Sequence, residues 1–307
     1  MSHLDFYREH GISPVAYHVS RDRLFEMRAS LYRSLRLPPL VFRGSTVLEV
    51  ASGTGQNAEY LASLGVAYLE LVEPNPIGWK PSALRPKPVK LEAYEPPFPF
   101  DIVICESWLG LRDFDMLDKV ASTVAPQGVL VLTCIHPQGA RPIMLRRALA
   151  ARLIDDSMSF EAKTEVLVQA FESHLATIKD MTRSTRDWVR DVLINPAVEH
   201  YGLTFPMLLE RLKGFTVLGT NPEFAADWRW FKSLHGQQRE FNAHALAEYN
   251  RNASRFRHYL DEDSTAGIDE AERLLQRSDI TISDVRNMGP FRGLFGRETI
   301  FASFQRD

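Results

Sequence analysis

Two acidic side chains flank a glycine-rich turn and are well suited to hold a charged ligand. The turn follows an apolar, β-branched run that ends at Glu49, and it contains Gly53 and Gly55. Glycine lets a backbone approach a ligand where a Cβ atom would collide, and a helix after the turn offers unpaired N–H groups. Glu73 ends a second apolar run about 20 residues after the glycines, the spacing at which a carboxylate accepts from ribose hydroxyls. We therefore expect a nucleoside-binding site.

Two classes of cofactor use such a turn. Gly53, Gly55 and Ala58 fit the G-x-G-x-x-G/A fingerprint of dinucleotide-binding proteins. Glu49 favours the other class, because a carboxylate at the strand end repels a pyrophosphate but attracts the ammonium group of S-adenosylmethionine. A third interpretation is an ordinary tight turn between a strand and a helix, since short motif matches are often accidental.

The elements that position these residues are predicted to form a parallel sheet. Near-continuous apolar runs, typical of strands covered on both faces, end near Glu49 and Glu73 and recur at 100–105 and 128–134. A helical spacing of apolar residues at 114–124 separates the last two runs. Strand, helix and strand with short connections imply an α/β fold. Ligands of open α/β sheets bind at the carboxyl ends of the strands.

Between about residues 40 and 137 the chain resembles the class I S-adenosylmethionine-dependent methyltransferases. Residues 49–55 follow the family's [DE]-x-G-x-G-x-G turn, with Ala51 in place of the first glycine. The resemblance implies S-adenosyl-L-methionine as cofactor and a Rossmann-like sheet of seven strands, the last antiparallel. A candidate strand at 88–91 would bring Glu92 or Ala93 beside the adenine. The cofactor-binding residues that the resemblance implies are Glu49, Ala51, Gly53, Gly55, Asn57, Glu73, Pro74, Glu92, Ala93 and Glu106.

A narrower resemblance, to bacterial methyltransferases associated with surface-polysaccharide genes, extends along the rest of the chain. Its segments are Phe6–Val15, 73–78, 227–232 and 295–297. It implies that the methyl group is transferred to a small-molecule acceptor, at an oxygen of a sugar, sugar phosphate or related bacterial metabolite.

Five regions are expected along the chain. An N-terminal helical segment, 1–45, precedes a cofactor-binding core at 46–137, and its helix from Ser20 to about Leu35 either covers the pocket or packs outside the sheet. Helical insertions at 138–213 and 221–297 are expected to form a cap over the ligand-binding edge. The last strands are predicted at 214–220 and 298–305, and His174, on an apolar helical stripe, is expected to be a core residue.

Methyl transfer needs mainly orientation of the acceptor, and a hydroxyl acceptor also benefits from a general base. His136 and Glu106 follow predicted strands, and both are candidate bases. An ordinary histidine pKa suits His136 to this role, although it could equally be a plain loop residue. The candidate acceptor-binding residues are Tyr7, Tyr17, Arg141, Trp228 and Arg229.

Composition agrees with an ordinary soluble enzyme, and we expect the protein to be cytoplasmic. The chain has 307 residues, 45% hydrophobic and 24% charged, with a formal net charge of −3. This charge implies no general attraction to nucleic acid. We expect no metal and no insertion into a membrane. The chain could form a homodimer. Cys105 and Cys134 are expected to be buried thiols in a reducing compartment. The alternatives to a methyltransferase are an NAD-dependent oxidoreductase and a non-catalytic cofactor-binding scaffold.

Overall fold

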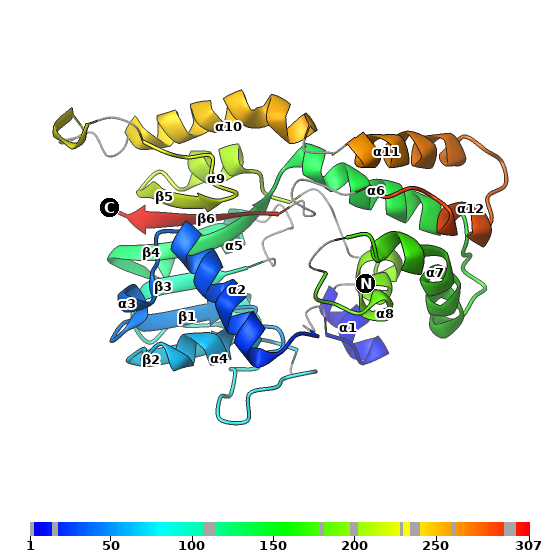
Figure 1. Ribbon diagram of the computed structural model, residues 1–307. Coiled ribbons are helices and arrows are strands. Elements are labelled where there is room, and N and C mark those ends of the chain that lie inside the picture. The colour runs from blue at the N-terminus through cyan, green and yellow to red at the C-terminus, as the bar shows by residue number, and fades with distance from the viewer. Residues whose placement is uncertain are drawn as a thin grey trace. The chain divides into compact units, whose positions relative to one another are not determined.

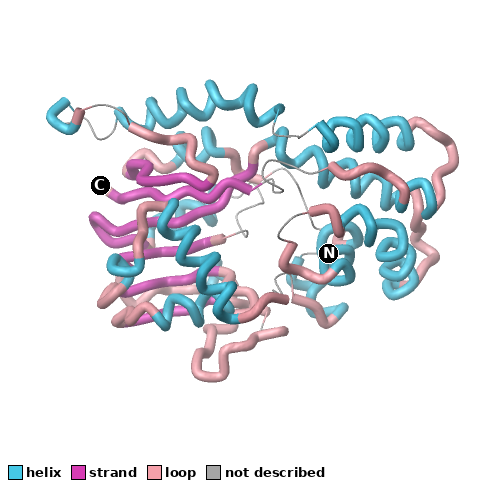
Figure 2. The backbone as a smooth tube through the Cα atoms, viewed as in Figure 1, coloured by secondary structure: helices cyan, strands magenta, loops and turns pink. Residues whose placement is uncertain are grey.

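A computed structural model of the chain describes residues 3–13, 18–75, 77–106, 114–178, 181–196, 202–227, 230–233, 240–258, 262–291 and 299–307, without the side chains of 138, 253–258 and 262–265. The chain forms two compact units (Figure 1). The first, called here the sheet unit, comprises Val19–His136, Tyr201–Ala253 and Thr299–Asp307. The second, the helical unit, comprises Met1–His18, Pro137–His200 and Ser254–Glu298. Among the described residues, all strands belong to the sheet unit (Figure 2).

The sheet has the order β2-β1-β3-β4-β6-β5. β2, β1, β3 and β4 are parallel, and β6 is antiparallel to both of its neighbours. The antiparallel last strand confirms the prediction, but the described residues form six strands and not seven. The strands are β1 (Thr46–Val50), β2 (Tyr68–Val72), β3 (Phe100–Cys105), β4 (Val124–Ile135), β5 (Phe215–Asn221) and β6 (Thr299–Arg306).

The predicted strand at 88–91 does not form, and proline explains why. Lys87 makes a single parallel bridge with Val72 at the edge of the sheet, and a 3₁₀ turn, η1 (Leu91–Ala93), follows. Pro86 and Pro88 flank the bridge. Because proline has no N–H to donate to a ladder, the pairing cannot extend in either direction.

The helices of the sheet unit cover both faces of the sheet. Figure 1 shows α2 crossing in front of the strands, where helices α2 and α4 pack on Val47, Ile102 and Ile104. On the opposite face, the ring of Phe205 on α9 lies 6.5 Å from that of Phe304 on β6. The helices are α2 (Arg21–Ser34), α3 (Pro39–Phe42), α4 (Gln56–Ser63), α5 (Phe114–Ser122), α9 (Phe205–Arg211), η3 (Phe231–Ser233) and α10 (Glu240–His258), whose last residues belong to the helical unit.

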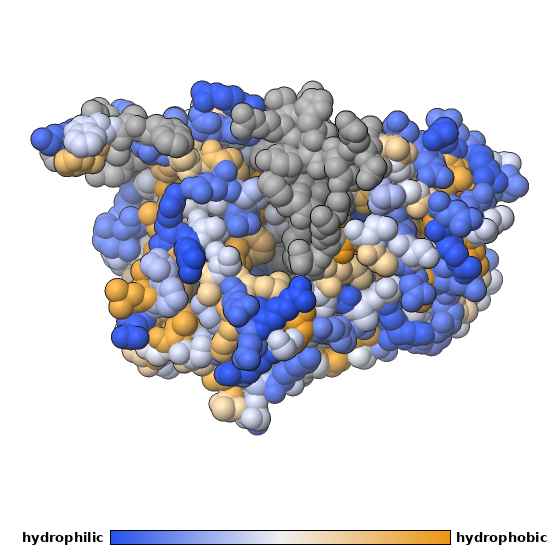
Figure 3. Space-filling view, in the orientation of Figure 1, coloured by the Kyte–Doolittle hydropathy of each residue, from blue (hydrophilic) through white to orange (hydrophobic). Residues whose placement is uncertain are grey.

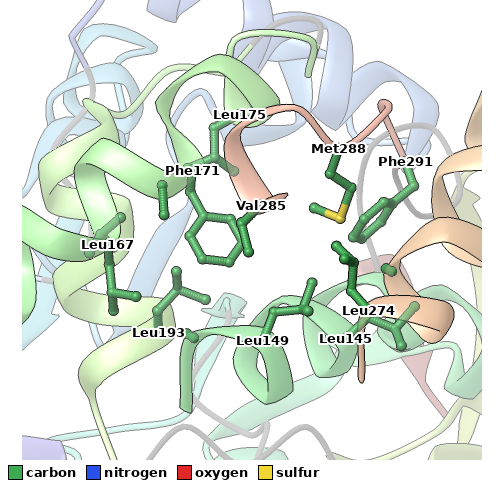
Figure 4. Packing of buried hydrophobic residues seen from close by; sticks show 14 of the residues in the cluster. Leu145, Leu149, Leu167, Phe171, Leu175, Leu193, Leu274, Val285, Met288 and Phe291 are labelled. Carbon is green, nitrogen blue, oxygen red and sulfur yellow. The ribbon is translucent and has the colours of Figure 1, made fainter. Parts of the chain in front are cut away.

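The helical unit has its own hydrophobic core. Apolar side chains of α6, α7, α11 and α12 meet around Leu149, Phe171 and Val285, all fully buried (Figure 4). His174 lies beside this core, 1% exposed, and its Nε2 accepts from Arg146 at 3.0 Å, so the prediction of a core histidine is confirmed. The helices are α1 (His3–His10), α6 (Pro137–Ala151), α7 (Phe160–Leu175), α8 (Thr185–Trp188), η2 (Val189–Ile194, a π-helix), α11 (Glu262–Leu275) and α12 (Ile282–Arg286).

Hydrophilic residues cover much of the face drawn in Figure 3. Within the described residues, none of the helices has the length and apolar character that crossing a membrane requires. Cys105 and Cys134 are buried free thiols, as predicted.

Candidate cofactor site

Four ionisable side chains lie at the carboxyl ends of four neighbouring strands. Glu73, Glu106 and His136 directly follow β2, β3 and β4, and Glu49 is the next-to-last residue of β1. Because these strands are parallel and adjacent in the sheet, all four residues belong to the same edge. The short apolar runs of the sequence therefore correctly predicted which polar residues the sheet would bring together.

Glu49 is buried, with one carboxylate oxygen bonded and the other left without a partner. Side chains alternate along a strand, so Glu49 points to the same face as Val47, toward α2 and α4. Its Oε1 accepts from Asn57 Nδ2 at 2.8 Å, and Asn57 in turn contacts the Tyr32 hydroxyl. Its Oε2 is buried and has no hydrogen-bond partner among the described residues. A buried acceptor without a donor is costly, so this oxygen marks a place for a donor from a ligand.

Burial governs the charge of Glu49. Desolvation raises the pKa of its carboxyl to about 8, while the hydrogen bond from Asn57 acts in the opposite direction. The carboxylates of Glu106 and Glu73 raise the pKa further, and the Arg28 guanidinium lowers it. Glu49 is thus mostly protonated at neutral pH, and a cationic group at Oε2 would favour the ionised form.

The glycine turn adopts left-handed backbone conformations at three positions. Ala51, Gly53 and Gly55 have φ of 57°, 57° and 76°. At Gly55 an ideal Cβ atom would lie 2.7 Å from the Trp79 indole and 2.8 Å from Pro81. Close packing of the protein's own side chains therefore requires Gly55, whereas the sequence suggested that both glycines make room for a ligand.

Glu73 holds the glycine turn from the neighbouring strand. Its Oε2 accepts from the backbone N–H of Gly53 and its Oε1 from that of Asn75, each at 2.7 Å. Burial raises the pKa of Glu73, and the two backbone donors lower it. Each carboxylate oxygen can accept a further hydrogen bond, so a role toward ribose hydroxyls is compatible with this structural role, which the sequence did not reveal.

Glu106 is engaged by a residue that the sequence analysis missed. Arg28 on α2 directs Nη1 to both carboxylate oxygens of Glu106, at 2.9 Å and 2.6 Å, and is 8% exposed. This ion pair occupies both oxygens and argues against Glu106 as a general base. The signal for Arg28 was present in the sequence, since it lies between Leu24 and Tyr32 on the buried face of α2.

His136 is buried and close to an aromatic ring. It is 3% exposed, and its ring centroid lies 5.5 Å from that of Tyr249. Burial lowers the pKa of His136 to about 4, so the imidazole is neutral near pH 7. It can accept a proton but is a weaker base than the ordinary histidine that the sequence suggested.

The buried histidines predict a loss of stability in acid. A group whose folded pKa is depressed is less protonated when folded, so its contribution to stability declines as pH falls from its unfolded pKa toward the folded value. For His136 these values are 6.5 and about 4. Between pH 7 and pH 4.5 we expect the wild type to lose about 2 kcal/mol relative to His136→Asn, which lacks this titration. Urea unfolding of both proteins at several pH values measures this difference, and a constant difference would contradict the burial of a neutral imidazole.

The remaining predicted cofactor residues divide into two groups. Pro74 directly follows Glu73 and is partly buried. Glu92 and Ala93, in contrast, are exposed on η1, where the Glu92 carbonyl accepts from Lys119 Nζ. The structure therefore gives them no visible connection to Glu49 or Glu73.

The predicted acceptor residues that the structure describes both belong to the helical unit. The Tyr7 hydroxyl donates to Asp191 Oδ1 at 2.8 Å, and Arg141 forms an ion pair with Glu272. Tyr17, Trp228 and Arg229 lie outside the described residues. A role in acceptor binding stays a prediction for all five.

Comparisons with known proteins match structures but not sequences. No family model and no curated protein sequence matches the chain. Among solved structures, an S-adenosylmethionine-dependent methyltransferase from Mesorhizobium loti is 12% identical and matches over 94% of this chain and 100% of its own, with a TM-score of 0.44. The plantazolicin methyltransferase BpumL, in complex with SAH (S-adenosylhomocysteine), is 10% identical over 99% of this chain and 88% of its own, with a TM-score of 0.42.

A partial match is also found. CalS10, an amino pentose methyltransferase from Micromonospora echinaspora with bound SAM, is 20% identical over 41% of this chain and 52% of its own, with a TM-score of 0.28. At these values a shared activity does not follow from the similarity. The function proposed below rests on the residues of the site.

Proposed function

We propose that this protein is an S-adenosylmethionine-dependent methyltransferase. The observation that carries the proposal is the buried Oε2 of Glu49, which has no partner within the described part of the chain and lies near the end of β1, just before the glycine turn. Glu73 follows the adjacent parallel strand and supplies a second carboxylate, which accepts a hydrogen bond from Gly53 of the glycine turn. One carboxylate suited to an ammonium group and one suited to ribose hydroxyls match the two polar ends of this cofactor.

The residues present fit such a cofactor. Glu49 would hold the ammonium group, the backbone around Gly53 would lie beside the methionine part, and Glu73 would hold the ribose. When bound, S-adenosylmethionine supplies a methyl group already activated by a sulfonium charge. The protein then needs mainly to orient the acceptor, and His136, neutral and at the same sheet edge, is the group that would accept a proton from it.

The resemblance of the sequence to methyltransferases associated with surface polysaccharides supports a finer proposal for the acceptor. We propose an oxygen of a sugar, sugar phosphate or related metabolite. Methyl transfer from labelled S-adenosylmethionine to a panel of sugars, sugar phosphates and short peptides would test this class, and labelling confined to peptides would exclude it.

Two alternatives make different predictions. An NAD-dependent oxidoreductase would place a pyrophosphate at the glycine turn, where the Gly53 N–H already donates to the Glu73 carboxylate, so the pyrophosphate and this carboxylate would repel each other. A non-catalytic scaffold would bind the cofactor but transfer no methyl group to any acceptor of the panel.

Calorimetric titration decides between the cofactors. We expect S-adenosylhomocysteine to bind the wild-type protein and NAD to give no heat at the same concentrations. Glu59→Gln, which changes a partly exposed acid on α4 that pairs with Arg21, is a matched control and should bind as the wild type does. Binding of NAD without any response to S-adenosylhomocysteine would overturn the proposal.

A further inference from the structure

Arg28 is a buried cation whose position on α2 needs an explanation. Its side chain is 9% exposed and that of its partner Glu106 is 16% exposed. A buried ion pair recovers the cost of desolvation only with very good geometry. Here both short contacts to Glu106 come from one nitrogen, Nη1. A guanidinium matches a carboxylate best when two of its nitrogens donate in parallel. This pair does not use that arrangement.

Arg28 is also connected to Glu49, through its own helix and through its charge. Tyr32, one helical turn after Arg28, contacts Asn57, which donates to Glu49. The charges of both Arg28 and Glu106 act on the carboxyl of Glu49 and shift its pKa in opposite directions. The charges of the guanidinium, the Glu106 carboxylate and the Glu49 carboxyl therefore act on one another within one cluster, of which Glu106 is the partly exposed member.

The members of this group are complementary to an amino acid. An amino acid carries an ammonium and a carboxylate on the same carbon atom, and the site offers an unpartnered acceptor oxygen and a guanidinium within one cluster. In the structure the Glu106 carboxylate already occupies the guanidinium, as the carboxylate of such a ligand would.

We propose that Arg28 binds the carboxylate at the methionine end of the cofactor, and that Glu106 holds this position until the ligand carboxylate replaces it. The inference rests on the proposed function and adds to it the residue that recognises the second charge of the amino acid. Glu106, being partly exposed, can be solvated when it leaves Arg28.

The test uses a pair of ligands that differ by one group. Binding constants are measured by calorimetry for S-adenosylhomocysteine and for the analogue that lacks only its carboxylate. In Arg28→Gln we expect S-adenosylhomocysteine to bind at least about tenfold more weakly, the range for a lost hydrogen bond to a charged group. The affinity for the analogue should stay unchanged, so the variant should no longer prefer S-adenosylhomocysteine over the analogue that lacks the carboxylate.

Three further variants make the result specific. Glu106→Gln should strengthen S-adenosylhomocysteine binding, because the competing carboxylate is gone, and should leave the analogue unaffected. Arg28→Lys should retain part of the preference, since it keeps the charge but loses the planar fork. Arg33→Gln, an exposed position on the same helix, should bind both ligands as the wild type does.

The outcomes separate this inference from the proposed function. Wild-type protein that binds neither ligand contradicts the proposed function. Suppose that the wild-type protein binds S-adenosylhomocysteine. If Arg28→Gln then keeps the preference for S-adenosylhomocysteine over the analogue, or weakens the binding of both ligands equally, the role of Arg28 is overturned and the proposed function stands. Weaker S-adenosylhomocysteine binding in Glu106→Gln overturns the exchange.

Discussion

Replacing Glu49 by glutamine is expected to stabilise the protein and, at the same time, to weaken its binding of the proposed cofactor. The folded pKa of Glu49, about 8, lies above the ordinary value of 4.5. A carboxyl of this kind binds more protons in the folded state, so its contribution to stability is complete below pH 4.5 and declines as pH rises toward 8. Glutamine has a similar shape and does not titrate, so the variant avoids this loss.

The expected effect is large. Between pH 5 and pH 7.5 the free energy of unfolding of Glu49→Gln should increase relative to the wild type by about 3 kcal/mol, from the distance between the two pKa values. The buried histidines change stability in the opposite direction over part of this range, but they are present in both proteins and cancel in the difference. Urea unfolding at each pH measures this difference, with Glu59→Gln, at a partly exposed acid, as the control.

The same substitution should weaken S-adenosylhomocysteine binding by at least about tenfold, because an amide cannot supply the charge that an ammonium group requires. Glu49 would then be a residue retained for its ligand at the expense of the fold. A variant that is less stable than the wild type at pH 7.5, or that binds S-adenosylhomocysteine normally, would show that Glu49 has a structural role instead.

The sequence predicted the strands of the sheet well, because each strand is a local pattern. The run at 100–105 became β3 without change, and the last strand, predicted at 298–305, became β6 (Thr299–Arg306). The runs that end near Glu49 and Glu73 became β1 and β2, so the two acids could be assigned to neighbouring strand ends before their contacts were known. The strand expected at 88–91 is the exception, since prolines prevent the pairing that its apolar residues suggest.

The contacts within the site were harder to predict, because they join distant parts of the chain. Arg28 and Glu106 are 78 residues apart, and neither residue indicates the other in a linear reading. What the sequence does contain is a charged residue on an otherwise apolar helical face. Burial of that face forces the charge to find a partner, so this pattern predicts a buried ion pair without naming its second member.

Tertiary packing also gives single residues roles or pKa values that differ from those predicted from the sequence. Gly55 is required by the Trp79 ring above it, and this contact depends on a loop whose course the sequence does not reveal. His136 was expected to have an ordinary pKa, and its burial, which depends on the tertiary fold, lowers the value to about 4. Residue type and spacing predicted which ionisable residues end the strands, and the tertiary structure determines their protonation states.

Glu73 provides the second large prediction, since its variants should lose both stability and cofactor affinity. Glu73→Ala leaves the buried N–H groups of Gly53 and Asn75 without their acceptor. Each unsatisfied buried donor costs about 1–3 kcal/mol, so for the two donors together we expect a loss of about 2–6 kcal/mol in the free energy of unfolding. Under the proposed function, cofactor affinity should fall with it, because the glycine turn is no longer held and the ribose would lose its acceptor.

Glutamine at position 73 distinguishes this structural role from a role toward the ribose alone. If Glu73 served only the ribose, an amide oxygen would still accept, and Glu73→Gln would be mild. In the structure both carboxylate oxygens accept from backbone N–H groups, so the amide NH₂ of glutamine must face one of these donors. We therefore expect Glu73→Gln to be destabilised almost as much as Glu73→Ala, while Glu92→Gln, at an exposed acid on η1, stays at the wild-type value. Urea unfolding and calorimetric titration of the three variants check this, and near-wild-type stability of Glu73→Gln would mean that the carboxylate does not bridge the turn.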